Sequence, residues 1–548
     1  MPLSHGKLQK NRAYFVVSFV LLIFIAFVQC HSVTKDLLWA PEADFDRDIS
    51  YIQSMLDGQF GKDPSYSGAY LWYNPLLFSI ETILVKITGL PIHLVVTRAG
   101  IYLNLLGPIA FVIMMVILFD YRVALASLLS YLFFSSGNIP GYAAATYSPW
   151  LYPVNFAQFL FYQSIILCYF AYSRQRYLWF FILGASIGLC FLGHAGPAIL
   201  MILIMFSLQA TRMVEAFREK NSQLLLTYLL QGVATFIPFV LVSLPFLFFI
   251  VGKYHLHFVN RLIATMVGGI FIRQNYLRMI SENLSVSAGI AFIGLVWFYR
   301  NYHQVLVRRI IFSWLFSAVF MFLYTSIEPG IERTFNIHLP VTVPSFHYFF
   351  YLKALQSIFF GFGLVYLVNK AYGWINKTRQ LSWLLNGPGR DQILILTVLI
   401  SAIIYFPAYE KRRDFVHLRE QALMKQNDTD KIQVYNYIVK NISPDKVILC
   451  DLPNSLFPVM PTARKLVAIH PTFSNPYCDF SNRNDARNNM LTYLKTGEPE
   501  SAKSLFIRYR VGLVLLPNYE YAVAKNLTAM SGGVVFRNNG YTLFSVRE

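Results

Sequence analysis

Trp39-Ala-Pro-Glu-Ala-Asp-Phe-Asp-Arg-Asp48 is the stretch on which the interpretation of the whole chain depends. It places four carboxylates within seven positions, in a chain of which only 14% of the residues are charged: Glu42, Asp44, Asp46 and Asp48. If a helix begins near Asp46, the helix dipole favours anions in its entry turn, so a solvated helix start accounts for the cluster. A catalytic or metal-binding site accounts for it equally well, and the surrounding sequence has to decide.

The composition predicts a polytopic α-helical membrane protein. Of the 548 residues 56% are hydrophobic, whereas soluble chains are about 45–50% apolar and about 25% charged. The net charge is +18, but much of the lysine and arginine lies in short connectors between apolar runs, as the positive-inside rule requires. Nucleic acid is therefore a poor explanation of the basic charge.

Apolar runs predict about eleven membrane-spanning helices. The first, residues 13–28, follows Lys7, Lys10 and Arg12 and lacks small residues at a cleavage position, so we interpret it as an uncleaved span with the N-terminus inside. An odd number of spans returns the C-terminus to the outside. The other spans are expected near 93–119, up to 134, 154–172, 177–192, up to 208, 224–251, 286–299, 310–325, 346–369 and 392–407.

The acidic stretch lies in a long external loop over residues 31–92. Within it, residues 48–56 predict a short helix that Asp57-Gly58 ends. A second amphipathic segment begins at Leu71-Trp-Tyr-Asn-Pro75 and reaches Thr88, and it is expected to lie at the membrane interface.

The chain divides by composition into a membrane domain, residues 1–407, and a soluble extracytoplasmic domain, residues 408–548. The second is a small α/β domain of roughly 140 residues. Cys450 and Cys478 fit either a disulfide or two free thiols. We expect a helix over 431–441 and strands over 446–450, 465–469, 511–516 and 541–546.

The first external loop resembles that of the GT-C superfamily of membrane glycosyltransferases. An Asp follows the first span, a Gly closes a short helix fourteen residues later (Asp44 to Gly58), and Tyr73-Asn-Pro75 precedes a juxtamembrane helix. Thr97-Arg-Ala-Gly100 then starts the second span. The superfamily includes protein O-mannosyltransferases, the lipid A aminoarabinose transferase and the catalytic subunit of oligosaccharyltransferase. The resemblance covers nearly the whole chain and implies transfer of a sugar from a polyprenyl-phosphate carrier on the outer face.

The resemblance assigns the catalytic carboxylate to Asp44. Many members have Glu immediately after it, but here Phe45 follows, so a second carboxylate must be Asp46 or Asp48 or be dispensable. Members that bind a metal usually add an acidic residue from the second external loop, and residues 137–158 contain none. No cofactor is therefore established. A Mg²⁺ or Mn²⁺ ion, if one binds, would be held by Asp44 and Asp46.

Glycosyl transfer requires a base for the acceptor and charge stabilisation for the leaving phosphate. We expect Asp44 to be the base, with Asp46 as co-ligand, orienting partner or the base itself. One basic loop lies outside the membrane if the spans are counted from an N-terminus inside. Its basic residues would bind the phosphate, because Arg forms bidentate hydrogen bonds to phosphate and Lys contacts it as a point charge. A loop lying on anionic headgroups explains them too. The phosphate candidates are Lys253, Arg261, Arg273 and Arg278, with His347 and Lys353 from the outer part of the tenth span, and the substrate candidates are Tyr73, His255 and His257.

Other polar residues have a structural explanation beside a functional one. Lys353 is costly at its membrane depth unless it functions or snorkels. His194, in Gly193-His-Ala-Gly-Pro197, is better explained as the cap of a helix break. An acceptor contact or a structural polar loop explains the remaining cluster, His470, Asn475, Asp479 and Arg483.

A transporter or flippase of lipid-linked or small substrates is the main alternative, and a scaffold with a degenerate site is a third. A transporter would place ionisable groups near the midplane and often show repeats, whereas here the charges lie mostly in loops. The glycosyltransferase hypothesis predicts a multi-pass protein of a bacterial inner membrane, with its site and C-terminal domain facing the periplasm. Its partners would be membrane lipids, a polyprenyl-phosphate-linked sugar and a glycan, lipid or protein acceptor.

Overall fold

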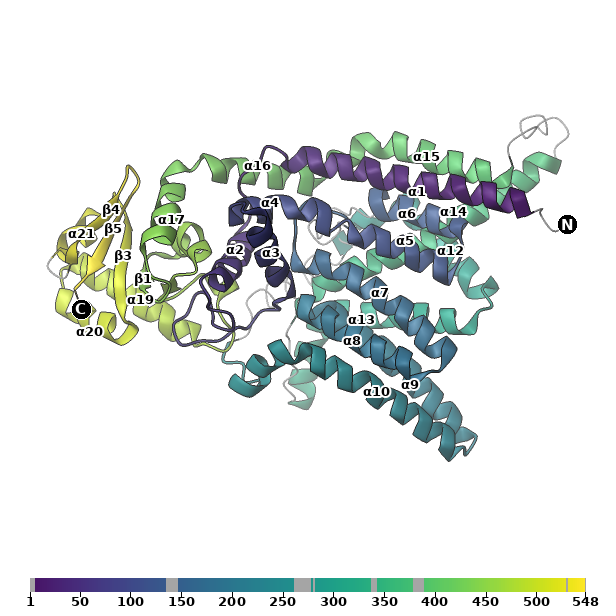
Figure 1. The fold of residues 1–548 in the computed structure, drawn as a ribbon, viewed down its shortest axis with the longest axis horizontal. Helices are drawn as coiled ribbons and strands as arrows, with labels where there is room; N and C mark the ends of the chain where they lie inside the picture. Colours follow the sequence, from purple (N-terminus) through teal and green to yellow (C-terminus); the bar gives the residue numbers. More distant parts are fainter. Residues whose placement is uncertain are drawn as a thin grey trace. The chain divides into compact units, whose positions relative to one another are not determined.

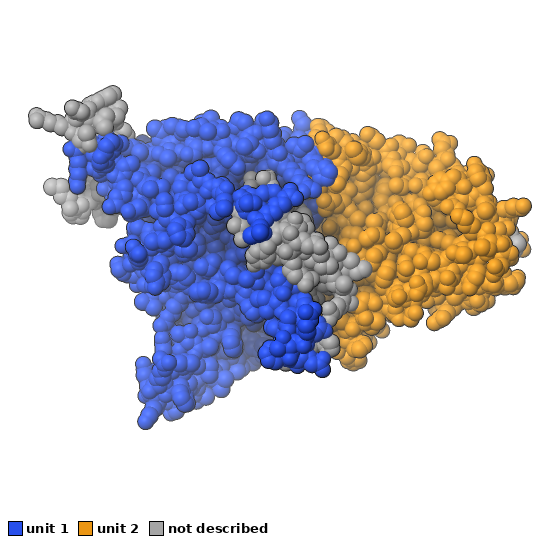
Figure 2. All heavy atoms as spheres, turned by 180° about the vertical axis from the view of Figure 1, so that it is seen from behind, with its two compact units in different colours: residues 1–35, 100–243, 267–417 blue, residues 36–99, 244–266, 418–548 orange. Residues whose placement is uncertain are grey.

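The computed structural model describes residues 5–134, 146–260, 277–278, 281–336, 343–377, 389–528 and 531–547. The chain falls into two compact units, coloured separately in Figure 2. Unit 1 comprises residues 1–35, 100–243 and 267–417, and unit 2 comprises residues 36–99, 244–266 and 418–548. Most of the predicted first external loop, residues 36–92, therefore belongs to the same compact unit as the C-terminal segment.

Unit 1 is a helical bundle (Figure 1). Eight helical segments in the described part of the chain are long and apolar enough to cross a membrane. Two shorter apolar helices, Tyr121–Phe134 and Tyr177–Gly193, and the helix Val286–Asn301 coincide with the other expected spans. The polytopic α-helical fold class is thus confirmed. The eight segments are Arg12–Thr34, Ile92–Leu118, Pro153–Arg174, Ala195–Arg218, Ser222–Lys253, Val305–Phe335, Ser345–Lys377 and Arg390–Asn427.

Several helices of the bundle follow one another through short connections, whereas residues 35–91 separate α1 from α4. Their bounds are α1 (His5–Thr34), α4 (Ile92–Leu103), α5 (Leu106–Leu118), α6 (Tyr121–Leu129), η1 (Ser130–Phe134), α7 (Pro153–Arg174), α8 (Tyr177–Gly193), α9 (Ala195–Arg218), α10 (Ser222–Leu247), α12 (Val286–Asn301), α13 (Val305–Phe335), η4 (Ser345–Tyr348), α14 (Phe349–Lys377), α15 (Arg390–Tyr409) and α16 (Arg413–Asn427). Three of these helices are divided between the units: residues 92–99 of α4, 244–247 of α10 and 418–427 of α16 belong to unit 2.

Helices α12 and α14 pack with their backbones in contact. A Cβ on Gly294 of α12 would collide with the carbonyl of Phe359, and one on Gly363 of α14 would collide with that of Ile290. Small residues at such positions allow two helices to approach closely. In a bilayer this close packing matters, because the hydrophobic effect does not drive helices together there. This pair forms one wall of the cavity described below.

Unit 2 contains a five-stranded sheet of strand order β2-β1-β3-β5-β4. Strand β1 pairs in parallel with β2 and β3, and β5 runs antiparallel to β3 and β4. The expected small sheet domain is confirmed. The bounds in this unit are α2 (Ala43–Leu56), α3 (Leu76–Thr88), η3 (Phe248–Lys253), α17 (Thr429–Asn441), β1 (Val447–Leu449), α18 (Leu452–Asn454), η6 (Ser455–Val459), η7 (Met460–Thr462), β2 (Lys465–Leu466), η8 (Pro471–Phe473), α19 (Phe480–Thr496), α20 (Pro499–Tyr509), β3 (Val511–Pro517), α21 (Tyr521–Leu527), β4 (Ser531–Arg537) and β5 (Tyr541–Val546).

Alternation along the strands builds a hydrophobic core on each face of the sheet. Val514 and Leu516 of β3 pack with residues of α19, α20 and α21, whereas Leu513 and Leu515 pack on the other face with residues of α17. Side chains of successive strand residues point to opposite faces, so one strand serves both cores. Figure 1 shows α20 and α21 on the side of the sheet away from α17.

The first external loop lies against the edge of this sheet. The amide of Leu466 in edge strand β2 donates to the carbonyl of Ser65 at 2.7 Å, and the Lys465 ammonium donates to the carbonyl of Asp63 at 2.7 Å. An edge strand otherwise exposes unpaired backbone groups. Tyr66, buried at 1% exposure, adds its ring to the core on the α17 face.

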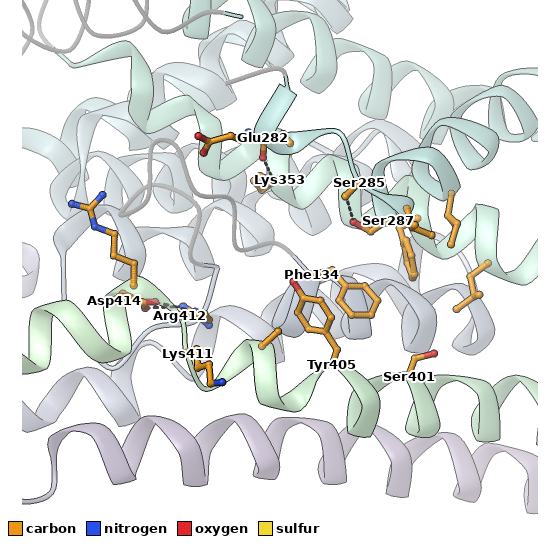
Figure 3. Close-up of a pocket in the computed structure, with 17 residues that line it drawn as sticks. Phe134, Glu282, Ser285, Ser287, Lys353, Ser401, Tyr405, Lys411, Arg412 and Asp414 are labelled. Carbon is orange, nitrogen blue, oxygen red and sulfur yellow. Dashed lines mark hydrogen bonds and ion pairs between the residues drawn. The ribbon is translucent and has the colours of Figure 1, made fainter. Parts of the chain in front are cut away.

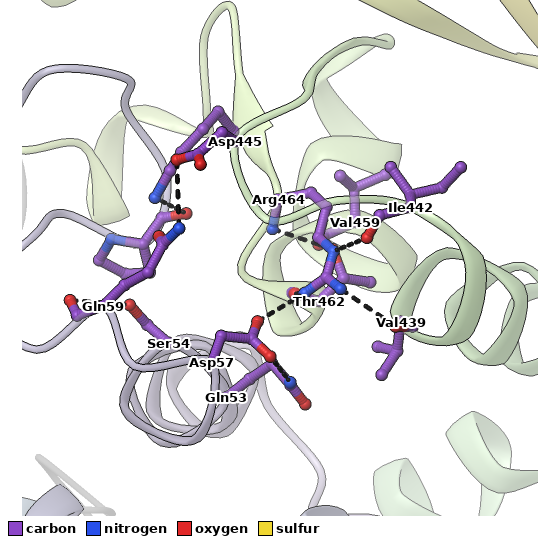
Figure 4. Close-up of polar contacts among 12 residues, drawn as sticks. Gln53, Ser54, Asp57, Gln59, Val439, Ile442, Asp445, Val459, Thr462 and Arg464 are labelled. Atoms are coloured by element: carbon purple, nitrogen blue, oxygen red, sulfur yellow. Dashed lines mark hydrogen bonds and ion pairs between the residues drawn. The ribbon is translucent and has the colours of Figure 1, made fainter.

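A buried arginine attaches the end of α2 to the same domain (Figure 4). Arg464 forms an ion pair with Asp57 at 2.8 Å and donates to the carbonyls of Ile442 and Val439. Arg464 therefore connects the C-terminus of α2 to the segment between α17 and β2. Cys450 and Cys478 are both free cysteines, so no disulfide joins them.

Candidate functional site

The acidic stretch forms the start of α2, which begins at Ala43 and not near Asp48 as the sequence indicated. Phe45, Ile49 and Ile52 are fully buried, and their spacing is that of one helix face. The apolar period thus starts three residues before Asp48 and extends the helix back through the carboxylates. Gly58, with φ of +75°, ends the helix as expected.

One arginine bridges two of the carboxylates. Arg47 contacts Asp44 at 2.8 Å and Asp48 at 2.6 Å, and its guanidinium lies 4.3 Å from the centroid of the Tyr73 ring. A planar guanidinium can both fork to carboxylates and stack on an aromatic face. Tyr73, a predicted substrate contact, is therefore placed where it supports Arg47.

Exposure separates Asp44 from its neighbours. The side chain of Asp44 is 37% exposed, whereas that of Asp48 is 1% exposed and that of Asp46 is 4% exposed. Burial raises the pKa of Asp48 to about 7, against the opposing effect of Arg47. Burial also raises the pKa of Asp46, opposed by Lys425. Asp44 alone among these three combines ordinary solvent access with a fixed position.

Asp46 has a buried lysine as its partner. The Lys425 ammonium, from the last turn of α16, lies 2.5 Å from an Asp46 carboxylate oxygen, although 379 positions separate the two in the chain. The same ammonium lies 5.7 Å from the Trp39 ring centroid and 4.9 Å from that of Phe457. These rings attract a cation through their faces.

These residues do not fit a divalent cation at Asp44 and Asp46. Each of the two carboxylates already contacts a side-chain cation, Arg47 or Lys425. Among the residues that the structure describes, no group of three or more His, Cys, Asp or Glu side chains is placed to hold a metal ion.

The predicted phosphate-binding residues are distributed over both units. Lys253, at the end of η3 in unit 2, is exposed, with its ammonium 5.3 Å from the Tyr70 ring centroid. His255 and His257 follow it and are exposed as well. Arg278, in unit 1, is exposed and paired with Glu282 at 2.8 Å. The remaining two loop candidates, Arg261 and Arg273, lie outside the described residues.

The other two candidates, His347 and Lys353, lie in unit 1 at the start of the tenth expected span. The His347 and His194 rings meet edge to face at 5.1 Å between centroids. His194 accepts a hydrogen bond from the Gly196 amide at 3.1 Å, which is the geometry of a cap at the start of α9. Lys353 is only 4% exposed and donates to Asn283 at 2.5 Å.

Lys353 lines a cavity of about 770 Å³ in unit 1 (Figure 3). Apolar residues of η1, α12, α14 and α15 and four cationic side chains are among the residues that line this cavity. The apolar residues are Phe134, Val286, Ile290, Phe360, Leu364 and Ala408, and the cations are Lys353, Lys411, Arg412 and Arg413. The lining also contains two carboxylates, Glu282 and Asp414, and the hydroxyls of Ser285, Ser287, Ser401 and Tyr405. A cavity with apolar surface and an excess of cations over carboxylates suits an amphiphile that carries an anionic head.

The cations after α15 have different roles. Arg412 is buried and pairs with Asp414 at 2.7 Å, and Asp414 in turn accepts from the Ser148 hydroxyl at 3.0 Å. The Trp150 indole donates to the Asp414 carbonyl at 2.5 Å. Arg412 is thus held by the protein, whereas Lys411 and Arg413 are exposed side chains on the cavity wall.

Sequence reasoning missed Lys411, Arg412, Arg413 and Lys425. The first three carried a usable signal, since Glu410-Lys-Arg-Arg-Asp414 follows the last span on the side that parity places outside. The same exception to the positive-inside rule singled out the loop containing Lys253. Lys425 carried no such signal, because only the fold brings it to Asp46.

The polar cluster of the soluble domain has structural partners. Asn475, 1% exposed, donates to the Asp63 carboxylate at 2.6 Å. Asp479 caps α19 through the Asn482 amide, and the Arg483 guanidinium lies 4.3 Å from the centroid of the Tyr66 ring. His470 accepts from the Thr472 amide at 3.4 Å. These contacts support the structural interpretation of the cluster.

No model of a known protein family matches the chain, and no curated protein matches it. Solved structures do. Apo ArnT from Cupriavidus metallidurans is 13% identical, with 96% of this chain and 97% of that chain covered at a TM-score of 0.56. The apo oligosaccharyltransferase of Archaeoglobus fulgidus is 12% identical, with 100% and 75% covered at a TM-score of 0.54. Both are GT-C glycosyltransferases, and the chain therefore has the GT-C fold that its first-loop motif predicted.

Proposed function

We propose that the protein is a membrane glycosyltransferase that moves a sugar from a polyprenyl-phosphate carrier to a glycan, lipid or protein acceptor. The observation that carries the proposal is the cavity of about 770 Å³ in unit 1, which combines apolar walls with four cations. The GT-C fold supports it, since ArnT has been solved bound to undecaprenyl phosphate and the archaeal oligosaccharyltransferase AglB in complex with a dolichol-phosphate.

The cavity would hold the donor. Its apolar walls would take the first isoprene units, and the ammonium of Lys353 with the exposed cations Lys411 and Arg413 would take the phosphate. Charge-assisted bonds to phosphate are about twice as strong as neutral ones. Arg412 would keep the segment in place through Asp414. The loop cations and His347 remain candidates for further phosphate contacts.

Asp44 would act as the general base. The acceptor oxygen or nitrogen forms a bond to the anomeric carbon as the bond from that carbon to the phosphate oxygen breaks, and the phosphate leaves with the electron pair. The acceptor proton passes to Asp44, whose half-exposed carboxylate is fixed by Arg47 at 2.8 Å. A base held within reach of solvent suits this role better than the buried Asp46.

The proposal includes a location. We place the protein in a bacterial inner membrane, with α2 and the C-terminal sheet domain on the periplasmic side, because basic connectors favour the opposite face. Lys253, His255, His257 and Tyr73 would contact the sugar or the acceptor on that side.

The test uses purified protein in lipid nanodiscs with a radiolabelled polyprenyl-phosphate sugar. Lys353→Met, Lys411→Met and Arg413→Met should weaken donor binding, and the triple variant should do so by at least about tenfold, since each charged hydrogen bond contributes about 1.5–3 kcal/mol. Arg300→Met is the matched control, because Arg300 is exposed in the last turn of α12 and does not line the cavity. Unchanged donor affinity in the triple variant would show that the cavity is not the donor site.

A further inference from the structure

The ion pair of Asp46 and Lys425 is more buried and has more surrounding contacts than a surface ion pair. Their side chains are 4% and 9% exposed, and the ammonium contacts the carboxylate at 2.5 Å. The Trp39 and Phe457 rings lie beside the ammonium. Burying two charges is costly, so such a pair persists only when its geometry is good and further contacts compensate the lost hydration.

The surroundings hold the ammonium in one position. Trp39 is itself fixed, because it stacks on His93 with centroids 4.5 Å apart and meets the edge of Tyr435 at 5.0 Å. Lys425 ends α16, where the helix dipole favours a cation. The long side chain thus delivers a charge from α16 to the first turn of α2 without freedom to swing away.

The Lys425 ammonium occupies a carboxylate oxygen of Asp46 that a divalent cation could otherwise bind. Carboxylate oxygens in one helical turn are the ligands that Mg²⁺ and Mn²⁺ prefer. Here the Asp46 oxygen contacts Lys425 and the Asp44 oxygen contacts Arg47. A divalent ion bound to either of these oxygens would lie close to a full positive charge, and repulsion between charges at such short range is strong outside bulk water.

We propose that the Lys425 ammonium takes the place of a divalent cation at the carboxylates that begin α2. Lys425 is a positioning residue: it neutralises Asp46 and holds the helix start in a fixed electrostatic state, so that no metal ion binds there. The inference goes beyond the proposed function and does not require it, because it concerns cation binding to the folded chain.

The experiment measures Mn²⁺ binding by electron paramagnetic resonance, at pH 8 in nanodiscs, for wild type, Lys425→Met, Lys425→Arg and Lys503→Met. Lys425→Met should bind Mn²⁺ at least about tenfold more tightly than wild type, because the competing charge is gone. Lys425→Arg keeps the charge and should resemble wild type. The matched control is Lys503→Met, which removes an exposed lysine paired with Glu500. The gain should vanish in Lys425→Met combined with Asp46→Asn.

Equal Mn²⁺ affinity in folded Lys425→Met and wild type would overturn the proposal. If Lys425→Met does not fold, a second measurement tests the proposal. Wild-type protein is compared with Asp44→Asn, a substitution at a half-exposed side chain. Wild-type Mn²⁺ binding that Asp44→Asn abolishes would overturn the proposal, and binding that is weak and equal in both supports it. Activity is a separate readout: transfer by wild type should persist in chelator, whereas an absence of all transfer would count against the proposed function alone.

Discussion

Replacing Arg47 by Met should destabilise unit 2 more than any surface substitution in it. Arg47 is 9% exposed at its side chain and forms ion pairs with Asp44 at 2.8 Å and Asp48 at 2.6 Å. Met keeps much of the volume and the contact with Tyr73 but leaves Asp48, 1% exposed, without its cation. The pair with Asp44 contributes little, because that carboxylate is in contact with solvent.

The magnitude follows from the buried partner. Removing one member of a buried ion pair costs about 3–5 kcal/mol, because the other charge stays in a poorly solvated position. For a folding unit of this size the melting temperature changes by about 2–4 °C per kcal/mol, so a fall of roughly 10 °C is expected. The cost is smaller below about pH 6, where Asp48, with a pKa of about 7 in the intact protein, can be neutral.

The assay is thermal and denaturant unfolding at pH 8, with tryptophan fluorescence as the readout. Arg508→Met, at an exposed position of the same unit, is the control and should have almost no effect. Adding Asp48→Asn to Arg47→Met should recover much of the loss, since the buried charge is then absent. A loss below about 1 kcal/mol, the range of exposed pairs, would refute the conclusion that Arg47 neutralises a buried carboxylate.

Three further outcomes are expected. Burial raises the pKa of Asp48 to about 7, whereas the carboxyl of the unfolded chain has a pKa of about 3.9. Between these pH values the folded protein binds one proton more than the unfolded chain, so the free energy of unfolding should fall as the pH rises from about 4 to about 7. Denaturant titrations should show that Asp48→Asn flattens this slope. Arg464→Met, which removes the buried ion pair with Asp57, should lower the free energy of unfolding of unit 2 by about 3–5 kcal/mol, and limited proteolysis should detect a loosened first external loop; a protease-resistant variant would contradict this. Gly294→Val would force its side chain against the Phe359 carbonyl, so the yield of detergent-stable protein should drop clearly below wild type, and an unaffected yield would argue against backbone contact between α12 and α14.

Much of the architecture was predictable because it follows from patterns local in sequence. Each of the eleven apolar runs coincides with a helix, and strands β1, β3 and β5 lie where short apolar runs predicted them. Strand β2 covers only Lys465–Leu466 of the expected 465–469. Strand β4, over Ser531–Arg537, was missed because its Ser-Gly-Gly start resembles a loop and its residues are largely exposed.

The candidate site was predictable only in part. The carboxylates of α2 stand out by their density, and the GT-C resemblance selected Asp44, which is the accessible one of the three in the helix. What each carboxylate contacts was not predictable, since Lys425 reaches Asp46 across 379 positions. The cavity cations Lys411 and Arg413 are exceptions to the positive-inside rule that are visible in the sequence. Such an exception does not show which cations line a cavity.

The most direct test of the account is the turnover of Asp44→Asn with a polyprenyl-phosphate sugar and a competent acceptor. Asn keeps the shape of the side chain and removes its basicity, and losing a general base typically costs about 10²–10⁴ in rate. Turnover should fall at least about a hundredfold with donor affinity nearly intact, whereas Asp428→Asn, at another partly exposed carboxylate, should retain activity. Near-normal turnover in Asp44→Asn would contradict the assignment of Asp44 as the general base.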